Sequence, residues 1–202
     1  MKLLGAQTSP FTRKARLVLL EKSIPHEFIT APPRDPDSPI NGVNPLAKIP
    51  ALVLDDGDCI FDSTVIAEYA DTLNDAPILI PRNDALARMR VRRWEALADG
   101  IAEAAVAVRY ETARPPEKQD EETITRNNNT LTRSLTHAAA QLGDKPWCEG
   151  GTITLADLAL TAALVYVNLR QPDRDWRGTH GNLAAWFERM SGRESVRKSL
   201  EG

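Results

Sequence analysis

The chain has 202 residues, of which 42% are hydrophobic and 26% are charged, a composition typical of globular proteins that bury a core. That length accommodates one large domain or two small ones. The net charge of −3 at pH 7 disfavours nucleic acid and anionic membrane surfaces as partners. No apolar run reaches the roughly 20 residues of a membrane helix, and the N-terminus lacks the pattern of a secretory signal, so we expect a cytoplasmic protein.

The first seventy residues alternate short strand-like runs with helical ones, a pattern that is typical of βαβ units. In chain order these runs predict a strand at residues 2–5, a helix at 10–22, a strand at 26–30, and a β-hairpin formed by 51–54 and 59–61. Several prolines between residues 32 and 39 predict an irregular loop before the hairpin. The helix after the hairpin is expected to bury Val65, Ile66, Tyr69 and Leu73.

From residue 83 onward the patterns are helical only. They predict a long helix that ends before Pro115, followed by helices at residues 119–142, 155–169 and 183–190. The run from Asn127 to Asn129 weakens the second of these helices, because asparagine is a poor helix former. We therefore predict an α/β N-terminal domain of residues 1–77 and an all-α C-terminal domain of residues 83–202.

The cysteines and histidines do not form a metal-binding pattern. Cys59 and Cys148 lie far apart, without a C-x-x-C spacing, and the three histidines are scattered. We expect both cysteines to be small buried hydrophobic residues, and we predict no metal site.

Three short stretches have both a structural and a chemical interpretation. Ser9-Pro10 is a helix-start signature, because serine is a favoured N-cap and proline fits the first helical position. Ile49-Pro50 precedes a strand, and a proline there marks either the start of the strand or a cis turn. Asp62-Ser63 opens the next helix, where capping again explains both residues.

Together, in this order, Ser9-Pro10-Phe11, Lys48-Ile49-Pro50 and Asp62-Ser63 resemble the glutathione-binding half of the cytosolic glutathione transferases, in particular the bacterial members with a Ser-Pro-Phe start. The resemblance implies a thioredoxin-like N-terminal domain, an all-helical C-terminal domain and a homodimer in which the first domain of one subunit packs against the helices of the other. The stretch from Thr154 to Asp157 is similar to the family's capping box, and its expected role is in folding.

The resemblance also implies a role for each matching residue. The hydroxyl of Ser9 would face the sulfur of glutathione, with Thr8 as the competing hydroxyl one residue earlier. The backbone of Ile49, held by a cis Pro50, would bind the cysteinyl part of the tripeptide. Lys48 would bind the glycyl carboxylate.

The γ-glutamyl end of glutathione would lie at the start of the second helix. Ser63 and its backbone amide suit the α-carboxylate there, and Asp62 suits the ammonium group. Glutathione enters as a co-substrate, so no further cofactor is expected.

The chemistry implied for Ser9 is feasible in magnitude. Lowering the pKa of a thiol by about two units requires roughly 2.7 kcal/mol of preferential stabilisation of the anion. A hydrogen bond to a charged group supplies about 1.5 to 3 kcal/mol, and a helix N-terminus adds about 0.3 to 1 kcal/mol. Ser9 and Thr12 stand where C-x-x-C enzymes have cysteines, which disfavours disulfide exchange.

The second substrate is expected to be a small hydrophobic electrophile that contacts Phe11, Val106, Arg109 and Tyr110. Two alternatives remain open on the same fold. One is a non-catalytic glutathione-binding or protein-interaction module, and the other is a glutathione-dependent peroxidase, isomerase or dehalogenase.

Overall fold

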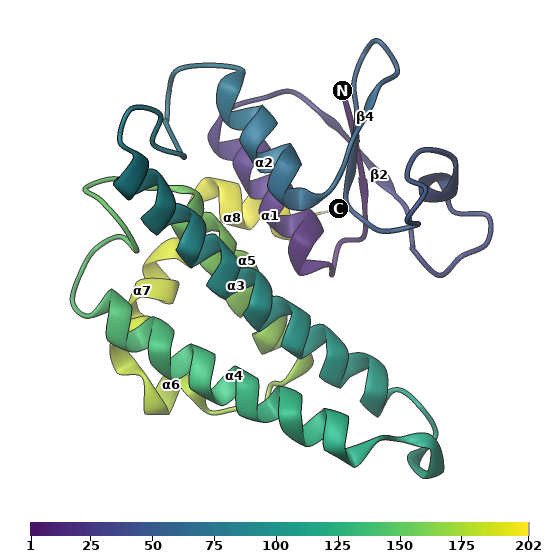
Figure 1. Cartoon of the computed structure of the whole chain (residues 1–202), viewed down its shortest axis with the longest axis vertical. Coiled ribbons are helices and arrows are strands. Elements are labelled where there is room, and N and C mark those ends of the chain that lie inside the picture. Colours follow the sequence, from purple (N-terminus) through teal and green to yellow (C-terminus); the bar gives the residue numbers. More distant parts are fainter. Residues whose placement is uncertain (202) are drawn as a thin grey trace.

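The first part of the chain forms a small mixed sheet in a computed structural model that describes residues 1–201. Its strands are β1 (Lys2–Gly5), β2 (Glu27–Thr30), β3 (Ala51–Val53) and β4 (Cys59–Ile60), in the spatial order β2-β1-β3-β4 (Figure 1). Strands β1 and β2 are parallel, whereas β3 runs antiparallel to both of its neighbours. The strands predicted at residues 2–5 and 26–30 and the predicted hairpin are therefore confirmed.

The two faces of this sheet are covered differently, because successive side chains of a strand point to opposite faces. Leu3 and Leu52 belong to the main core, together with residues of α1 (Pro10–Glu21) and α2 (Ser63–Thr72). Leu4 and Ala51 face the other way and pack with Ile40, which lies in the short 3-10 helix η1 (Pro39–Gly42). The proline-rich loop thus covers the second face of the sheet.

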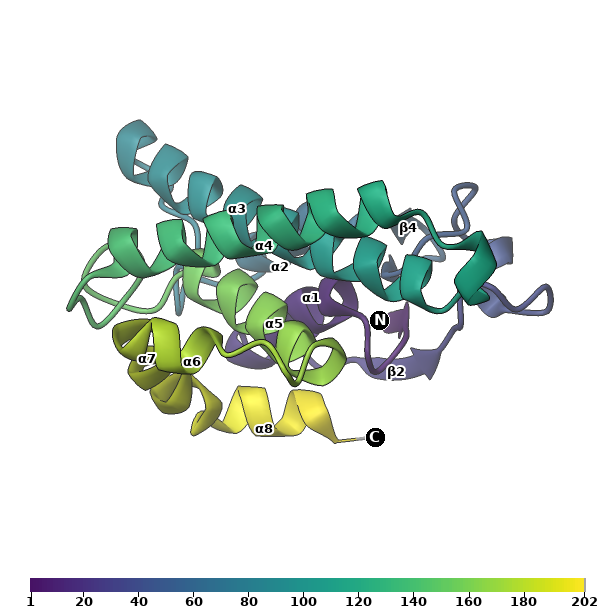
Figure 2. The same cartoon turned by 90° about the horizontal axis from the view of Figure 1, so that it is seen from below.

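The rest of the chain is helical. It contains α3 (Ala85–Thr112), the 3-10 turn η2 (Pro116–Lys118), α4 (Glu121–Leu142), α5 (Leu155–Arg170), α6 (Trp176–Thr179), α7 (Gly181–Ser191) and α8 (Glu194–Leu200). Figure 2 shows α3 and α4 side by side as two long helices, with α8 on the opposite side of the molecule. None of the helices within residues 1–201 is both long enough and apolar enough to cross a membrane.

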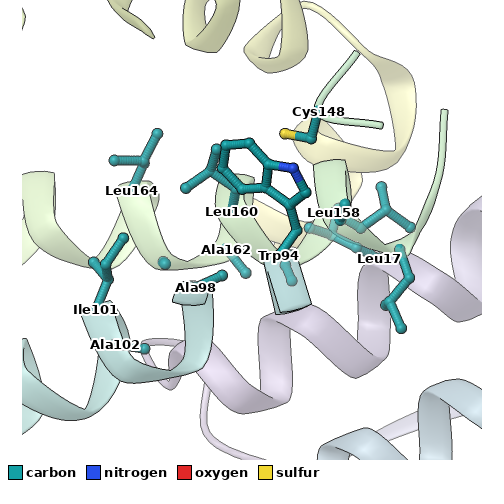
Figure 3. Packing of buried hydrophobic residues seen from close by; sticks show 14 of the residues in the cluster. Leu17, Trp94, Ala98, Ile101, Ala102, Cys148, Leu158, Leu160, Ala162 and Leu164 are labelled. Atoms are coloured by element: carbon teal, nitrogen blue, oxygen red, sulfur yellow. The ribbon is translucent and has the colours of Figure 1, made fainter. Parts of the chain in front are cut away.

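One continuous core joins the sheet to the helices. Leu17 of α1, Trp94 of α3 and Leu160 of α5 all belong to it, and Trp94 points towards Cys148 (Figure 3). Small residues such as Ala98 line the contact between α3 and α5 and allow the two helices to approach closely. The position of the first domain against the helices is therefore set by packing.

Some expectations about individual residues were wrong. On α2, Ile66 is buried and Tyr69 is half-buried as expected. However, Val65 is 50% exposed and Leu73, the C-cap, is 41% exposed, and Ala67 and Ala70 complete the buried face. Alanines lie on this face because the helix packs closely against its neighbours. The sequence pattern of apolar residues does not show how close two elements will be. Cys148 is buried as expected, but Cys59 is only half-buried.

Helix α4 runs without a break through the asparagines that weaken its pattern. The side chain of Asn127 donates to the carbonyl of Thr123 at 2.8 Å, and Asn128 accepts from Arg174 at 2.6 Å. Buried Leu131 and Leu135 anchor the following turns, so tertiary contacts outweigh the low helix propensity. Helices α6 and α8 were not predicted, and the boundary at residue 77 stays a prediction.

Candidate active site

The three predicted stretches, around Ser9, Pro50 and Asp62, adjoin the sheet at the same edge. The register places Leu4 opposite Ala51 and Leu52 opposite Ile60. Because β3 is antiparallel to β1 and to β4, the end of β1, the start of β3 and the end of β4 lie together. The turn with Ser9 comes after β1, residues 48–50 come before β3, and α2 starts after β4, so all three stretches lie next to these strand ends.

Ser9 is the N-cap of α1. Its backbone is extended, its Oγ accepts from the amide of Thr12 at 3.2 Å, and its own amide donates to the carbonyl of Ala6 at 2.9 Å. The residue is half-buried, whereas Thr8 is exposed. This cap uses Oγ only as an acceptor, so the hydroxyl proton of Ser9 remains available to donate at the positive end of the helix.

The close packing of α1 on the end of β1 depends on a glycine. A Cβ atom at Gly5 would lie 2.3 Å from Cγ2 of Thr12, which is far inside van der Waals contact. Thr12 is itself buried in the first turn of α1. Only glycine at position 5 therefore allows the helix to begin so close to the strand.

Pro50 is buried next to this turn, and the peptide bond between Ile49 and Pro50 is cis. Both predicted alternatives for Pro50 are confirmed, because the peptide bond is cis and β3 begins at the next residue. The buried Asn44 donates to the carbonyl of Lys48 at 2.7 Å and so fixes the loop that leads to Pro50. Ile49 is half-buried and the side chain of Lys48 is exposed.

Asp62 caps the N-terminus of α2. Its Oδ1 accepts from the amide of Thr64 at 2.9 Å, and Ser63 is buried in the first turn. A second helix N-terminus thus lies at the sheet edge that carries Ser9. Residues Ser9, Lys48, Ile49, Pro50, Asp62 and Ser63 come together as one group through the strand order.

The residues predicted for the second substrate are more dispersed. Phe11 and Val106 are half-buried against the main core, and Arg109 and Tyr110 are exposed near the end of α3. The guanidinium carbon of Arg34 lies 3.9 Å from the ring centroid of Tyr110, so the loop after β2 meets α3 there. Sequence reasoning missed Arg34, because a polar residue in a proline-rich loop carries no signal of a tertiary contact.

The C-terminal helix also contacts this region, through a buried arginine that sequence reasoning missed. Arg13 Nη2 donates to the carbonyl of Gln7 at 2.8 Å, in the loop before Ser9, and Nη1 donates to the carbonyl of Ser199 at 2.6 Å. The side chain of Gln7 in turn donates to the carbonyl of Leu200 at 2.9 Å. Burial, and to a lesser extent the charge of Arg16, lowers the pKa of Arg13 to about 10.

Comparison with known proteins identifies the family of the chain. Family models of the glutathione S-transferase N-terminal and C-terminal domains match residues 8–73 and 121–189. A protein of Escherichia coli K12, described as the uncharacterized GST-like protein YibF, is 40% identical over 199 residues, which are 98% of each chain.

Solved structures give the same result. A glutathione S-transferase from Methylobacillus flagellatus KT with glutathione bound is 40% identical, with a TM-score of 0.94 over 98% of each chain. A glutathione transferase family member from Pseudomonas fluorescens Pf-5 with bound glutathione is 36% identical, with a TM-score of 0.86 over 98% of this chain and 97% of that one. The Ser-Pro-Phe subtype stays a prediction. In both of its parts, the chain belongs to the glutathione S-transferase family.

Proposed function

We propose that this protein binds glutathione at the sheet edge and activates its thiol for attack on an electrophile. The observation that carries the proposal is the position of Ser9. Its hydroxyl lies at the N-terminus of α1 with a proton free to donate, at the edge where β3 begins after the cis Pro50. Relatives at 36% and 40% identity that hold glutathione in their structures support the binding step.

The tripeptide would lie extended along this edge. The backbone of Ile49, next to β3, is suited to pair with the cysteinyl unit as an added strand would. The γ-glutamyl end would reach the start of α2, where the hydroxyl and amide of Ser63 would donate to the carboxylate and Asp62 would accept from the ammonium group. Lys48 is exposed and would reach the glycyl carboxylate.

The reaction would begin with loss of the thiol proton to solvent. Ser9 donates to the resulting sulfur anion, and the α1 N-terminus adds its partial positive charge. The sulfur then attacks the electrophilic carbon, a carbon–sulfur bond forms, and the leaving group departs with the electron pair of the broken bond. The protein contributes electrostatic stabilisation of the nucleophile and its orientation.

We propose a homodimer as the working form, in the cytoplasm, with a boundary between the two domains near residue 77. Exposed large apolar side chains support the dimer, because contiguous apolar patches on a protein surface often mark an interface. Leu46 before β3 is 60% exposed, Val65 on α2 is 50% exposed, and Met89 on α3 is 47% exposed. They belong to both parts of the chain, as expected if the first domain of one subunit faces the helices of the other.

Three measurements on the purified protein test the proposed function. Calorimetry measures glutathione binding, ultraviolet difference absorption near 240 nm measures the bound thiolate, and 1-chloro-2,4-dinitrobenzene measures conjugation. The proposal requires all three signals. Binding without a thiolate band would identify a glutathione-binding module, and the absence of binding heat together with the absence of conjugation would identify an interaction module on the same fold.

A further inference from the structure

Three arginines gather around two tyrosines where the loop after β2 meets the ends of α3 and α5. We call Arg34, Arg109 and Arg170 the arginine cluster. Arg34 lies 3.9 Å from the ring centroid of Tyr110, and Arg170 lies 5.8 Å from that of Tyr166. Burial raises the pKa of Tyr166, and the charges of Arg170 and Arg109 oppose this shift, which is consistent with both lying close to its ring.

The arginine cluster lacks acidic partners. Within residues 1–201, no carboxylate lies within 4.0 Å of a guanidinium nitrogen of Arg34, Arg109 or Arg170. Six arginines elsewhere do form such pairs, namely Arg82, Arg88, Arg90, Arg92, Arg114 and Arg193, whereas others within residues 1–201, such as Arg133 and Arg197, do not, so the cluster is distinguished by its position around the tyrosines. In addition, Nε of Arg170 is buried without a hydrogen-bond partner. The positive charge of the cluster is therefore left for a ligand anion to neutralise.

The cluster begins at the sheet edge that carries Ser9. The amide of Ala31 donates to the carbonyl of Gly5 at 2.8 Å, so the loop that carries Arg34 leaves β2 beside the turn that leads to Ser9. Three residues of extended chain span at most about 11 Å, so the backbone of Arg34 stays close to that edge. From there its side chain reaches Tyr110 on α3 and joins the two parts of the chain on the side of Ser9.

We propose that the second substrate is an electrophile that carries a carboxylate on a flat apolar body, with the carboxylate bound by the arginine cluster. This inference rests on the proposed function. It changes the expected second substrate from a small hydrophobic electrophile to one that carries a negative charge. The planar guanidinium matches a carboxylate with two parallel hydrogen bonds. Tyr110 is 43% exposed, and the part of its ring that Arg34 leaves uncovered can contact the flat body.

A suitable probe is 4-chloro-3,5-dinitrobenzoate, with 4-chloro-3,5-dinitrobenzamide as its uncharged match. In both compounds the sulfur anion attacks the ring carbon that carries chlorine. A carbon–sulfur bond forms, the carbon–chlorine bond breaks, and chloride leaves with the bonding pair. The carboxylate takes no part in the reaction, so the two compounds differ mainly in the group that the arginine cluster would bind.

The experiment compares kcat/KM for the two compounds in the wild type, Arg34→Gln and Arg170→Gln. The ratio of acid to amide should fall about tenfold in each variant, as expected for loss of a hydrogen bond to a charged group. Arg133→Gln on α4 is the matched control, since Arg133 is also exposed and, within residues 1–201, its side chain hydrogen-bonds only to Thr130. Its ratio should stay within about twofold of the wild type. Because Arg34 is exposed, Arg34→Gln is expected to fold and can test the inference even if Arg170→Gln does not fold.

The possible failures are distinguishable. An unchanged ratio in Arg34→Gln, with the amide still conjugated, overturns this inference and leaves the proposed function intact. Weaker binding of glutathione itself by Arg34→Gln assigns that arginine to the tripeptide and also overturns the inference. If neither compound reacts, calorimetry with the two finished glutathione conjugates decides. The inference then requires that the wild type binds the acid conjugate more tightly than the amide conjugate, and that Arg34→Gln and Arg170→Gln do not. If the wild type does not bind glutathione, both proposals are wrong.

Discussion

Arg13 and Ser199 lie 186 positions apart in the chain and are joined by two hydrogen bonds. Arg13 Nη1 donates to the carbonyl of Ser199 at 2.6 Å and to its hydroxyl at 3.2 Å, while Nη2 holds the carbonyl of Gln7. A single buried side chain therefore links α8 with the loop that positions Ser9. The end of the chain is thereby part of the support of the candidate active site.

Replacing Arg13 by Met should lower the free energy of unfolding by about 3 kcal/mol, because buried acceptors at Gln7 and Ser199 lose a charged donor. Urea denaturation measures this loss. Arg197→Met on the exposed side of α8 is the control and should change stability little. Full stability of the Arg13 variant would show that α8 is held mainly by its apolar contacts.

Lys14→Met should destabilise the fold by about 3 to 5 kcal/mol near pH 8. Lys14 is 1% exposed, and its Nζ lies 3.0 Å from Glu95 and 2.7 Å from Asp99 of α3. Without the lysine, the partly buried Asp99 loses its cation, and the buried Glu95 keeps, among the described residues, only Arg92, at 2.6 Å. Urea denaturation of the variant and of the wild type measures the difference.

This destabilisation should be smaller at pH 5 than at pH 8. Burial raises the pKa of Asp99, Lys14 opposes this shift, and Glu95 and Glu103 add to it. The contribution of Asp99 to stability is therefore largest when it is protonated and is lost as the pH rises through its raised pKa. Removing Lys14 raises that pKa further. Lys198→Met, which breaks an exposed pair with Glu194, should show little change at either pH.

Ser9→Ala should reduce conjugation about 10- to 100-fold at pH 7, because loss of the hydrogen bond raises the pKa of the bound thiol by about one to two units. The deficit should shrink towards pH 9, where the thiolate forms without help. Steady-state rates over this pH range measure both effects. Thr8→Ala is the control, and a larger loss in that variant would transfer the role to Thr8.

Asp157→Asn should lower the free energy of unfolding by about 2 to 4 kcal/mol. The carboxylate of Asp157 is fully buried and accepts from the amides of Cys148 and Thr154 at 2.8 and 2.9 Å, and from the Thr154 hydroxyl at 3.0 Å. An amide group turns one of these acceptors into a donor. Thermal and urea unfolding should show the loss, while glutathione affinity in the folded protein stays close to that of the wild type.

Leu46→Asp should weaken the proposed dimer at least about tenfold, because a carboxylate would enter an apolar contact. Light scattering during gel filtration over a range of concentrations measures the association. Leu200→Asp on α8, where the leucine is 51% exposed, is the matched control and should leave the assembly unchanged. A monomeric wild type would contradict the dimer itself.

Much of the fold was predictable because its signals are local. Ser9-Pro10, Pro50 and Asp62 each mark the start of a helix or strand, and the sheet order brings these starts to one edge. The role of Asp157 follows from a capping pattern of four residues. Such features depend on neighbours in sequence, so the sequence predicts them with few assumptions.

The remaining features depend on distant partners. Nothing near Arg13 in sequence indicates that its acceptor is Ser199, and nothing near Arg34 indicates Tyr110. Part of the buried face of α2 was predicted wrongly, because Val65 is apolar yet exposed, whereas Ala67 and Ala70 are buried beside the correctly predicted Ile66. Patterns of apolar residues report which face can be buried, and the shape of the neighbour decides which face is buried.

The position of α8 against α1 has a consequence for synthesis on the ribosome. Glu21 at the end of α1 bonds Arg193 at 2.8 Å, and Arg13 near its start bonds Ser199. Because Arg13 and Ser199 are 186 positions apart, α1 meets this partner only after all the other helices have been synthesised. A nascent polypeptide that lacks α8 carries the sheet but leaves this flank of α1 in water, which makes it a target for chaperones and proteases until α8 has been synthesised.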